Sequence, residues 1–489
     1  MLVKRILSIL IIINMVVSPA AAAFAQEEEA RPLPISIKDV RLIAISNNLD
    51  IKLAQLDSKI KGTELSYKEA VFDTILNGEI GYTNDQRKSA SALSGTKSLT
   101  NEYNAGIDKK LRSGTDVEID FTNKREWTDS QYVSTNPYHD AQIEVSLTQP
   151  VAKNFFGLID RGNIEIVKWE IKNAELDSYI KIEDAMVLAE KAYWELVLAQ
   201  EEFKIKKEML KKAIRLFNQH RRKLKIGLVE TGDVLASEAN MYVRGSGLLM
   251  ASNELKTAEE LLKLRLNMKN EARLSPLDSL KGPAFDADFL ESLIAAFENR
   301  RDYKTKKNVI EARNIKLKMK SNSRFPEIDL KATFATNGID TRYGRAIEGV
   351  YEDSNPKYYV GIEFTYPLEN SAANSEFEKA TLEKTKAIVN LQKTEREIIS
   401  DVDEGFRKLS VDKVNLSKME RVENLQKGKL SQEEKRFRYG RSNSDTLIRY
   451  QEDLLNASLM TKRSYLDYRI SILDLLAAED SFLKHIGLE

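Results

Sequence analysis

Two short stretches carry charged residues in a pattern that could form ion pairs. The first is Lys225-Ile-Gly-Leu-Val-Glu-Thr-Gly-Asp-Val-Leu235, and the second is Phe437-Arg-Tyr-Gly-Arg-Ser-Asn-Ser-Asp-Thr-Leu447. Each places a glycine and a short polar loop before an aspartate and a helix-period apolar pattern. A carboxylate beside a guanidinium forms a charge-assisted link, and an aspartate after a glycine loop also caps the helix that follows. These residues could therefore form reversible ion pairs or cap the helices that follow.

The remaining residue types offer little for catalysis or metal binding. Cysteine is absent, and the three histidines, His139, His220 and His485, lie far apart in the sequence, so we interpret them as solvated side chains. No glycine-rich loop follows a strand, and no catalytic constellation stands out. We therefore expect a protein that is not an enzyme and that has no cofactor and no metal site. The formal net charge of zero argues against a nucleic-acid partner.

The N-terminus has the three parts of a secretory signal peptide. Lys4 and Arg5 precede an apolar segment from Ile6 to Val17, and Ala23-Phe24-Ala25 provides a cleavage site. Residues 1–25 are thus expected to be removed from an exported protein. No later segment has the run of about 18 apolar residues that a transmembrane helix needs. Any membrane crossing would therefore use β-strands, because lipid does not tolerate unpaired backbone groups.

Two long proline-free windows predict two helical arms. Residues 151–275 and 368–489 contain no proline, and proline breaks helix interiors. Apolar residues recur every seven positions, which indicates helices that pack at coiled-coil angles. The series are Ile182, Ala189, Leu196, Phe203, Leu210 and Phe217; Val234, Met241, Leu248, Leu255 and Leu262; and Val402, Leu409 and Leu416. A first helix from about 155 to 222 would be roughly 100 Å long.

Before each arm, apolar and polar residues alternate with the period of a β-strand. The first half has four such segments, centred on Ile80, Ala105, Ile119 and Val145, and the second half has two, centred on Leu330 and Ile362. Each is about ten residues long, the length of a tilted membrane strand, although a soluble sheet also has this period. Polar loops are predicted between the strands, at residues 86–100, 129–138 and 338–355.

The two halves repeat the same order of elements, which predicts one structural unit used twice. The first repeat is expected at 26–270, with strands over about 74–149 and a helical hairpin over 155–269 whose tip is 225–235. A linker follows at 271–285. The second repeat is expected at 286–489, with strands over about 327–367 and a hairpin over 371–486 whose tip is 438–447.

This arrangement resembles the TolC-type outer-membrane efflux proteins over nearly the whole mature chain. The two tips carry the resemblance, together with Leu147-Thr-Gln-Pro-Val151 and Leu454-Leu-Asn-Ala-Ser458. The resemblance implies an α+β membrane protein in which three subunits share one outer-membrane β-barrel and one periplasmic α-barrel. It also implies a passive duct in a tripartite efflux or type I secretion system. The partners would be two further copies of the chain, a periplasmic adaptor, an inner-membrane pump and outer-membrane lipid.

The resemblance also implies roles for the tip residues. Asp233, Arg438, Arg441 and Asp445 would form a periplasmic gate, while Gly227, Leu228, Val229, Tyr439 and Gly440 would dock an adaptor. The alternatives are helix capping for Asp233, a solvated side chain for Arg441, and turn geometry or local packing for the docking set.

Two features depart from the family pattern. Six candidate strands replace the usual four, because Asn101–Leu111 and Asp116–Trp127 form an additional pair that could be a barrel hairpin or an outer loop. The second tip is one residue shorter between its glycine and aspartate, and Ile448 stands where the family can carry a second aspartate.

The role of the strand aromatics and the function of the whole chain each have an alternative interpretation. The aromatic residues could form the girdles of a membrane barrel or be ordinary strand aromatics; they are Tyr82, Tyr103, Trp127, Tyr358, Tyr359 and Tyr366. A structural periplasmic coiled coil or a surface adhesin is the alternative to a channel. The exported substrate and the class of pump are left open.

Overall fold

The computed structural model describes residues 32–87, 93, 95–269, 272–352 and 355–488. The expected signal peptide lies outside these residues. The chain divides into two compact units: Met1–Asn48, Ala185–Phe285 and Ser410–Ser471 form the first, and Leu49–Asp184, Asp286–Leu409 and Ile472–Glu489 form the second. Each unit takes segments from both halves of the chain, so the compact units do not coincide with the expected repeats. No helix in the described part of the chain is long and apolar enough to cross a membrane.

The two halves of the chain have helices in the same order and of matching lengths, as the expected repeat requires. In the first half β1 (Leu33–Ile35), α1 (Ile37–Asn47) and α2 (Leu49–Glu69) lead to strands and then to α3 (Leu158–Lys225) and α4 (Thr231–Leu266). In the second half β6 (Leu274–Pro276), α5 (Phe289–Asn299) and α6 (Arg301–Asn322) lead to strands and then to α8 (Ser371–Arg438) and α9 (Ser444–Ala478). α1 and α5 have 11 residues each, and α3 and α8 have 68 each. β6 lies in the expected linker and pairs in parallel with β1.

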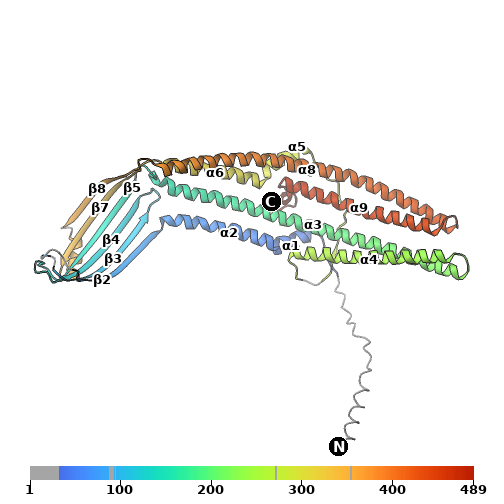
Figure 1. Ribbon diagram of the computed structural model, residues 1–489, viewed down its shortest axis with the longest axis horizontal. Coiled ribbons are helices and arrows are strands. Elements are labelled where there is room, and N and C mark those ends of the chain that lie inside the picture. Colours follow the sequence, from blue (N-terminus) through green and yellow to red (C-terminus); the bar gives the residue numbers. More distant parts are fainter. Residues whose placement is uncertain (1–31, 88–92, 94, 270–271, 353–354, 489) are drawn as a thin grey trace, which may run out of the picture. The chain divides into compact units, whose positions relative to one another are not determined.

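The first unit contains the tip-side part of each helical hairpin, since α3 and α8 begin in the second unit. α3 and α4 run to one tip, and α8 and α9 run to another (Figure 1). Near the tips, Leu216 of α3 packs with Leu430, Leu447 and Leu454 of the second hairpin, and all four are buried. This core joins the two hairpins, because its residues come from α3, α8 and α9. The seven-residue apolar spacing thus leads to helices that bury one stripe against each other.

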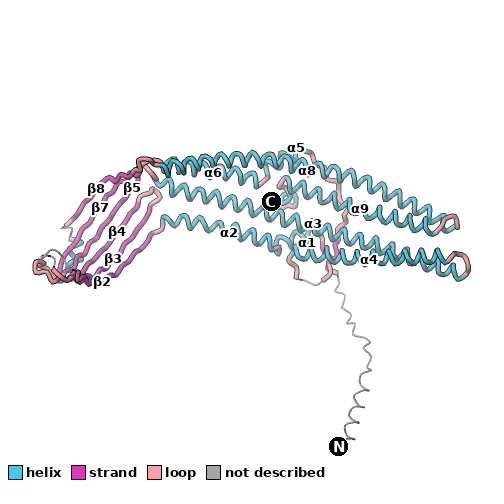
Figure 2. Tube along the Cα trace, in the orientation of Figure 1, coloured by secondary structure: helices cyan, strands magenta, loops and turns pink. Residues whose placement is uncertain are grey.

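The second unit contains one six-stranded antiparallel sheet (Figure 2). Its strands in spatial order are β2 (Thr74–Asp85), β3 (Ser98–Lys110), β4 (Asp116–Thr128), β5 (Tyr138–Pro150), β7 (Glu327–Asp340) and β8 (Pro356–Thr365). Four strands thus come from the first half and two from the second. Among the described residues, β2 and β8 are edge strands, and each pairs with another strand on one side only.

The register gives the sheet one apolar and one polar face, because directly paired residues lie on the same face. One continuous row across all six strands is Leu76, Ile107, Ile119, Val145, Phe334 and Tyr358. The neighbouring row on the other face is Asn77, Gly106, Asp120, Glu144, Ala335 and Lys357. The apolar face is open at the sheet edges, where Leu76 is 78% and Tyr358 is 72% exposed. Tyr359 follows Tyr358 directly, so the alternation puts it on the polar face, which favours the alternative of an ordinary strand aromatic for this residue.

A short helix covers part of the apolar face, where the sequence pattern predicted only a polar loop. α7 (Tyr343–Tyr351) buries Ala346 and Val350 against Ala141, with Phe121 and Ile143 beside them. Its backbone approaches β7 closely: a Cβ added at Gly338 would lie 2.3 Å from the Ala346 carbonyl oxygen. Apolar residues spaced by three and four positions give this segment a helical face that the sheet can bury.

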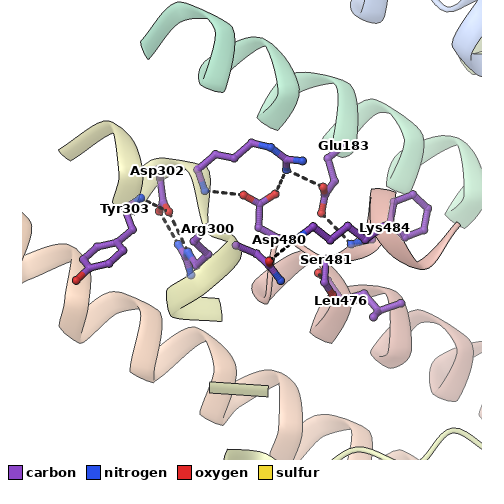
Figure 3. A network of polar contacts seen from close by, with 11 residues as sticks. Glu183, Arg300, Asp302, Tyr303, Leu476, Asp480, Ser481 and Lys484 are labelled. Atoms are coloured by element: carbon purple, nitrogen blue, oxygen red, sulfur yellow. Dashed lines mark hydrogen bonds and ion pairs between the residues drawn. The ribbon is translucent and has the colours of Figure 1, made fainter. Parts of the chain in front are cut away.

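A buried charge network joins three helical elements of the second unit (Figure 3). The Arg301 guanidinium at the start of α6 binds Glu183 of α3 at 3.0 Å and Asp480, which follows α9. The backbone N–H of Arg301 also donates to Asp480 Oδ2 at 2.6 Å, and that of Phe482 in α10 (Phe482–His485) donates to Glu183. All three charged residues are at most 9% exposed. One buried arginine therefore faces two buried carboxylates.

The excess carboxylate perturbs the protonation of Glu183. Burial, and then the charge of Asp480, raise the pKa of Glu183 to about 7, against the opposing effect of Arg301. The folded state therefore holds a proton on Glu183 at pH values where the unfolded state has lost it. The stability that this proton contributes is complete below the unfolded pKa of about 4.3 and is lost as the pH rises through about 7.

We expect the thermal unfolding midpoint of the protein to fall as the pH rises from 5.5 to 8.5. In Glu183→Gln the side chain is neutral at every pH, so this fall becomes smaller. Circular dichroism at 222 nm across that pH range measures both slopes. Glu195→Gln, at an exposed position of the same helix, serves as the control and keeps the wild-type slope. Equal slopes for wild type and Glu183→Gln would show that Glu183 does not titrate in this range.

Candidate functional site: the hairpin tips

Both ascending helices end in the same backbone motif. At the first tip, Gly227 N–H donates to the Leu224 carbonyl at 3.0 Å and Leu228 N–H donates to the Lys223 carbonyl at 2.9 Å. At the second tip, Gly440 N–H donates to Phe437 at 3.1 Å and Arg441 N–H to Arg436 at 2.9 Å. This is the Schellman pattern, which needs a left-handed residue at the glycine position. Gly227 and Gly440 have φ values of 69° and 68°, so both glycines are there for the turn.

The two loops are equal in length, which corrects the expectation of a shorter second tip. Each return helix is capped three residues after its glycine, at Glu230 in the first tip and at Asn443 in the second. Asn443 Oδ1 accepts from the Thr446 N–H at 2.9 Å. The spacing from glycine to aspartate is one residue shorter in the second tip because Asp233 is the third residue of α4, whereas Asp445 is the second residue of α9. The two aspartates are therefore not equivalent positions.

Asp233 takes part in capping, though not as the first cap residue. Its Oδ2 accepts from the Glu230 N–H at 3.4 Å, as the third helical residue of a capping box does. The side chain is half-buried, whereas Asp445, Arg438 and Arg441 are exposed. Within the described part of the chain, none of these four residues forms an ion pair. A single chain therefore does not bring the expected gate charges together.

A buried histidine links the two tips. His220 of α3 is 0% exposed, so the interpretation of all three histidines as solvated is wrong for this one. Its Nδ1 lies 3.2 Å from the Asp233 carbonyl oxygen, and its Nε2 lies 3.3 Å from Oγ of the buried Ser444. The Phe437 ring lies beside it, with ring centroids 6.1 Å apart. His220 thus contacts the start of α4 in its own hairpin and the start of α9 in the other. The described residues contain no cluster of histidine and acidic side chains suited to a metal ion.

The second tip is held by a buried carboxylate. Glu433 of α8 is 3% exposed and accepts a hydrogen bond from the Ser442 hydroxyl, while Arg436 lies 3.4 Å away. Ile448 packs beside the core of Leu216, Leu430, Leu447 and Leu454. The position where the family can carry a second aspartate is therefore part of the apolar packing here.

The outer surface of the first tip is apolar and exposed. Ile226 and Leu228 are 69% and 68% exposed, and Tyr439 at the second tip is 80% exposed. Val229 is half-buried, and Gly440 is exposed. Exposed apolar side chains at the end of a hairpin are typical of a surface that another molecule covers. Ile226 belongs to this surface and was missed by the sequence analysis, although it adjoins Gly227.

Sequence reasoning also missed His220, Ser444 and Glu433. His220 lies four residues after Leu216 and seven after Ala213, both of which are buried. A stripe with this three-and-four spacing would have placed His220 in the packed face of α3. The partners of Ser444 and Glu433 depend on contacts between segments, which local spacing does not reveal.

Comparison with known proteins shows which fold this is. By sequence, the chain matches no protein-family model and no curated protein. By structure, it is similar to the outer-membrane channel CmeC of Campylobacter jejuni, with a TM-score of 0.67 and 16% identity, covering 91% of this chain and 85% of that one. It is also similar to the open state of the outer-membrane channel MtrE of Neisseria gonorrhoeae, with a TM-score of 0.66 and 15% identity, covering 93% of this chain and 89% of that one. For the outer-membrane protein VceC of Vibrio cholerae, the TM-score is 0.64 and the identity is 14%, and the match covers 93% of this chain and 97% of that one.

The chain has the TolC-type fold. The resemblance that the tips and the repeat indicated is thus confirmed at the level of the fold, and the identities of 14–16% carry the comparison no further. This fold agrees with a mostly helical chain whose described part also contains a six-stranded sheet.

We expect His220→Ala to loosen both tips together, because it leaves a cavity and removes a partner of the Asp233 carbonyl and of Ser444. The local free energy of opening should fall by about 2 kcal/mol. Hydrogen–deuterium exchange should then accelerate roughly 30-fold in residues 223–235 and in residues 439–447. His485→Ala, at an exposed position, is the control and leaves both tips unchanged. Acceleration confined to one tip would contradict the link.

Proposed function

We propose that this protein is the outer-membrane duct of a tripartite efflux or type I secretion system. Three copies form one channel, which conducts substrate passively from the periplasm to the exterior. An inner-membrane pump supplies the energy, and a periplasmic adaptor connects the pump to the hairpin tips. The observation that carries the proposal is the six-stranded sheet with one apolar face and two unpaired edges.

The sheet supports a location in the outer membrane. A lipid-facing surface needs outward side chains that are apolar on every strand, and the row from Leu76 to Tyr358 has this property. The opposite face carries Asp120, Glu144 and Lys357 and suits a water-filled lumen. The unpaired edges of β2 and β8 need partner strands before they can enter lipid. Two further copies of the chain provide them.

The tips support a gate at the periplasmic entrance. Arg438, Arg441 and Asp445 are exposed in one chain, so their charges are free to face neighbouring hairpins in a trimer. Links of this kind are charge-assisted hydrogen bonds, and they would hold the entrance narrow. Asp233 contributes to the same ring and also caps α4.

Loss of a gate charge should open the entrance. We expect Arg441→Ser to raise the single-channel conductance of the purified trimer in a planar lipid bilayer, because inter-hairpin links are lost. Asp233→Asn should also raise it, because the charge is lost while the amide oxygen can still accept from the Glu230 N–H and cap α4. Lys153→Ser, at a position that pairs with Glu327 beside the sheet and far from the tips in sequence, should keep wild-type conductance.

Two results would separate the gate from the channel. Wild-type conductance in both tip variants would exclude a charge-based gate and leave the duct intact. Absence of any conductance in the wild-type protein would contradict the duct itself.

Adaptor docking at the tips should depend on exposed side chains rather than on the turn. Leu228→Ala removes an exposed side chain and keeps the backbone, so it should weaken capture of the cognate adaptor at least 5-fold in a pull-down. Gly227→Ala is the control for turn strain, because its φ of 69° disfavours a side chain. Equal loss in both variants would show that turn geometry matters, whereas unchanged capture in both would exclude docking at this tip.

A further inference from the structure

The additional strand pair occupies interior positions of the sheet. β3 and β4 lie between β2 and β5, and each pairs with a neighbour on both sides. β3 forms a continuous ladder with β2 from Thr74 to Asp85, and β4 pairs with β5 over residues 116–126. The pair therefore cannot be removed from the sheet without separating β2 from the other strands.

The inserted strands have the same two faces as their neighbours. Ile107 and Ile119 stand opposite each other in the apolar row, and they are 41% and 37% exposed. Asp120 stands in the polar row, opposite Glu144 of β5. β3 and β4 have 13 residues each, which exceeds the 9–11 or so that a tilted strand needs to cross a bilayer.

The turn of this hairpin lies at the end of the sheet where the helices begin. Leu111 N–H donates to the Thr115 carbonyl at 2.8 Å, which closes the turn. Gly114 meets Gly157, just before α3, so closely that an added Cβ would lie 2.7 Å from the Gly157 nitrogen. Arg112 lies 3.7 Å from Glu69 at the end of α2. The hairpin thus covers the full height of the sheet and does not protrude from the opposite end.

We propose that β3 and β4 are membrane staves, so that each subunit gives six strands to the shared barrel and the trimer has 18. This inference rests on the proposed function, because the sheet of one chain closes only in an oligomer. Four strands per subunit, as the family resemblance implied, would give 12. The structure assigns the additional hairpin to the wall of the duct rather than to an outer loop.

The number of staves sets the width of the duct. Barrel diameter grows roughly linearly with strand number, so 18 strands give a barrel about 1.5 times as wide as 12 and about twice the cross-section. The additional lumen wall is polar, with Asp120 and Thr122 of β4 and Asn104 of β3 on the inner face. The expected passengers are therefore bulkier than a 12-stranded wall would pass, and they are water-soluble.

Cysteine labelling tests the position of β4 directly, since the chain has no cysteine of its own. Ile119→Cys and Asp120→Cys probe the two faces of β4, and Val145→Cys and Glu144→Cys are their register partners in β5. The protein is placed in phosphatidylethanolamine–phosphatidylglycerol vesicles and treated with a membrane-impermeant maleimide. Asp120→Cys should react as fast as Glu144→Cys, and Ile119→Cys should react at least 10-fold more slowly, as Val145→Cys does. Electron microscopy of the wild-type trimer should then count 18 strands.

Three results overturn the proposal in distinguishable ways. Rapid labelling of Ile119→Cys with Val145→Cys still protected would place the additional hairpin in water and leave the channel intact. A trimer with 12 strands in the membrane would likewise show that the additional hairpin lies outside the membrane and that the channel is intact. Rapid labelling of both Ile119→Cys and Val145→Cys would remove the whole sheet from lipid and would contradict the proposed function as well.

Discussion

The unpaired edges of the six-stranded sheet are the constraint on which this molecule depends. The outer backbone groups of β2 and β8 have no partner strand in the described part of one chain. In lipid each unsatisfied group costs several kcal/mol, and in water the apolar face would be exposed instead. Under the proposed function, closure by further copies of the chain removes both costs, and the duct forms when the sheet is closed.

The two halves of the chain have the same set of elements. Each half has a pair of short helices, strands and a hairpin whose first helix has 68 residues. The halves differ mainly in the additional β3–β4 hairpin and in the starts of the return helices. His220 links the hairpins near their tips through Asp233 and Ser444. Under the proposed function, the two tips of a subunit would move as a pair, and the gate charges would act between subunits.

Periodicity alone predicted most of the elements, because both helices and strands here repeat their side-chain patterns over long distances. The alternation around Ile119 and Val145 indicated strands, and the glycines at 227 and 440 marked the helix ends. Contacts between distant segments were not predictable in this way. The buried Arg301 network needs α3, α6 and the C-terminal segment together, and His220 needs Ser444, which lies 224 positions away. α7 was missed because its apolar residues are buried through contacts with β4 and β5, which lie far from them in the sequence.

The mass of the detergent-extracted protein distinguishes a closed trimer from an open monomer. We expect the mature chain to leave outer-membrane fractions only with detergent, and light scattering, corrected for detergent, to give the mass of three chains. A monomer that is soluble in water without detergent would contradict it, because the sheet would then be stable with open edges and an uncovered apolar face.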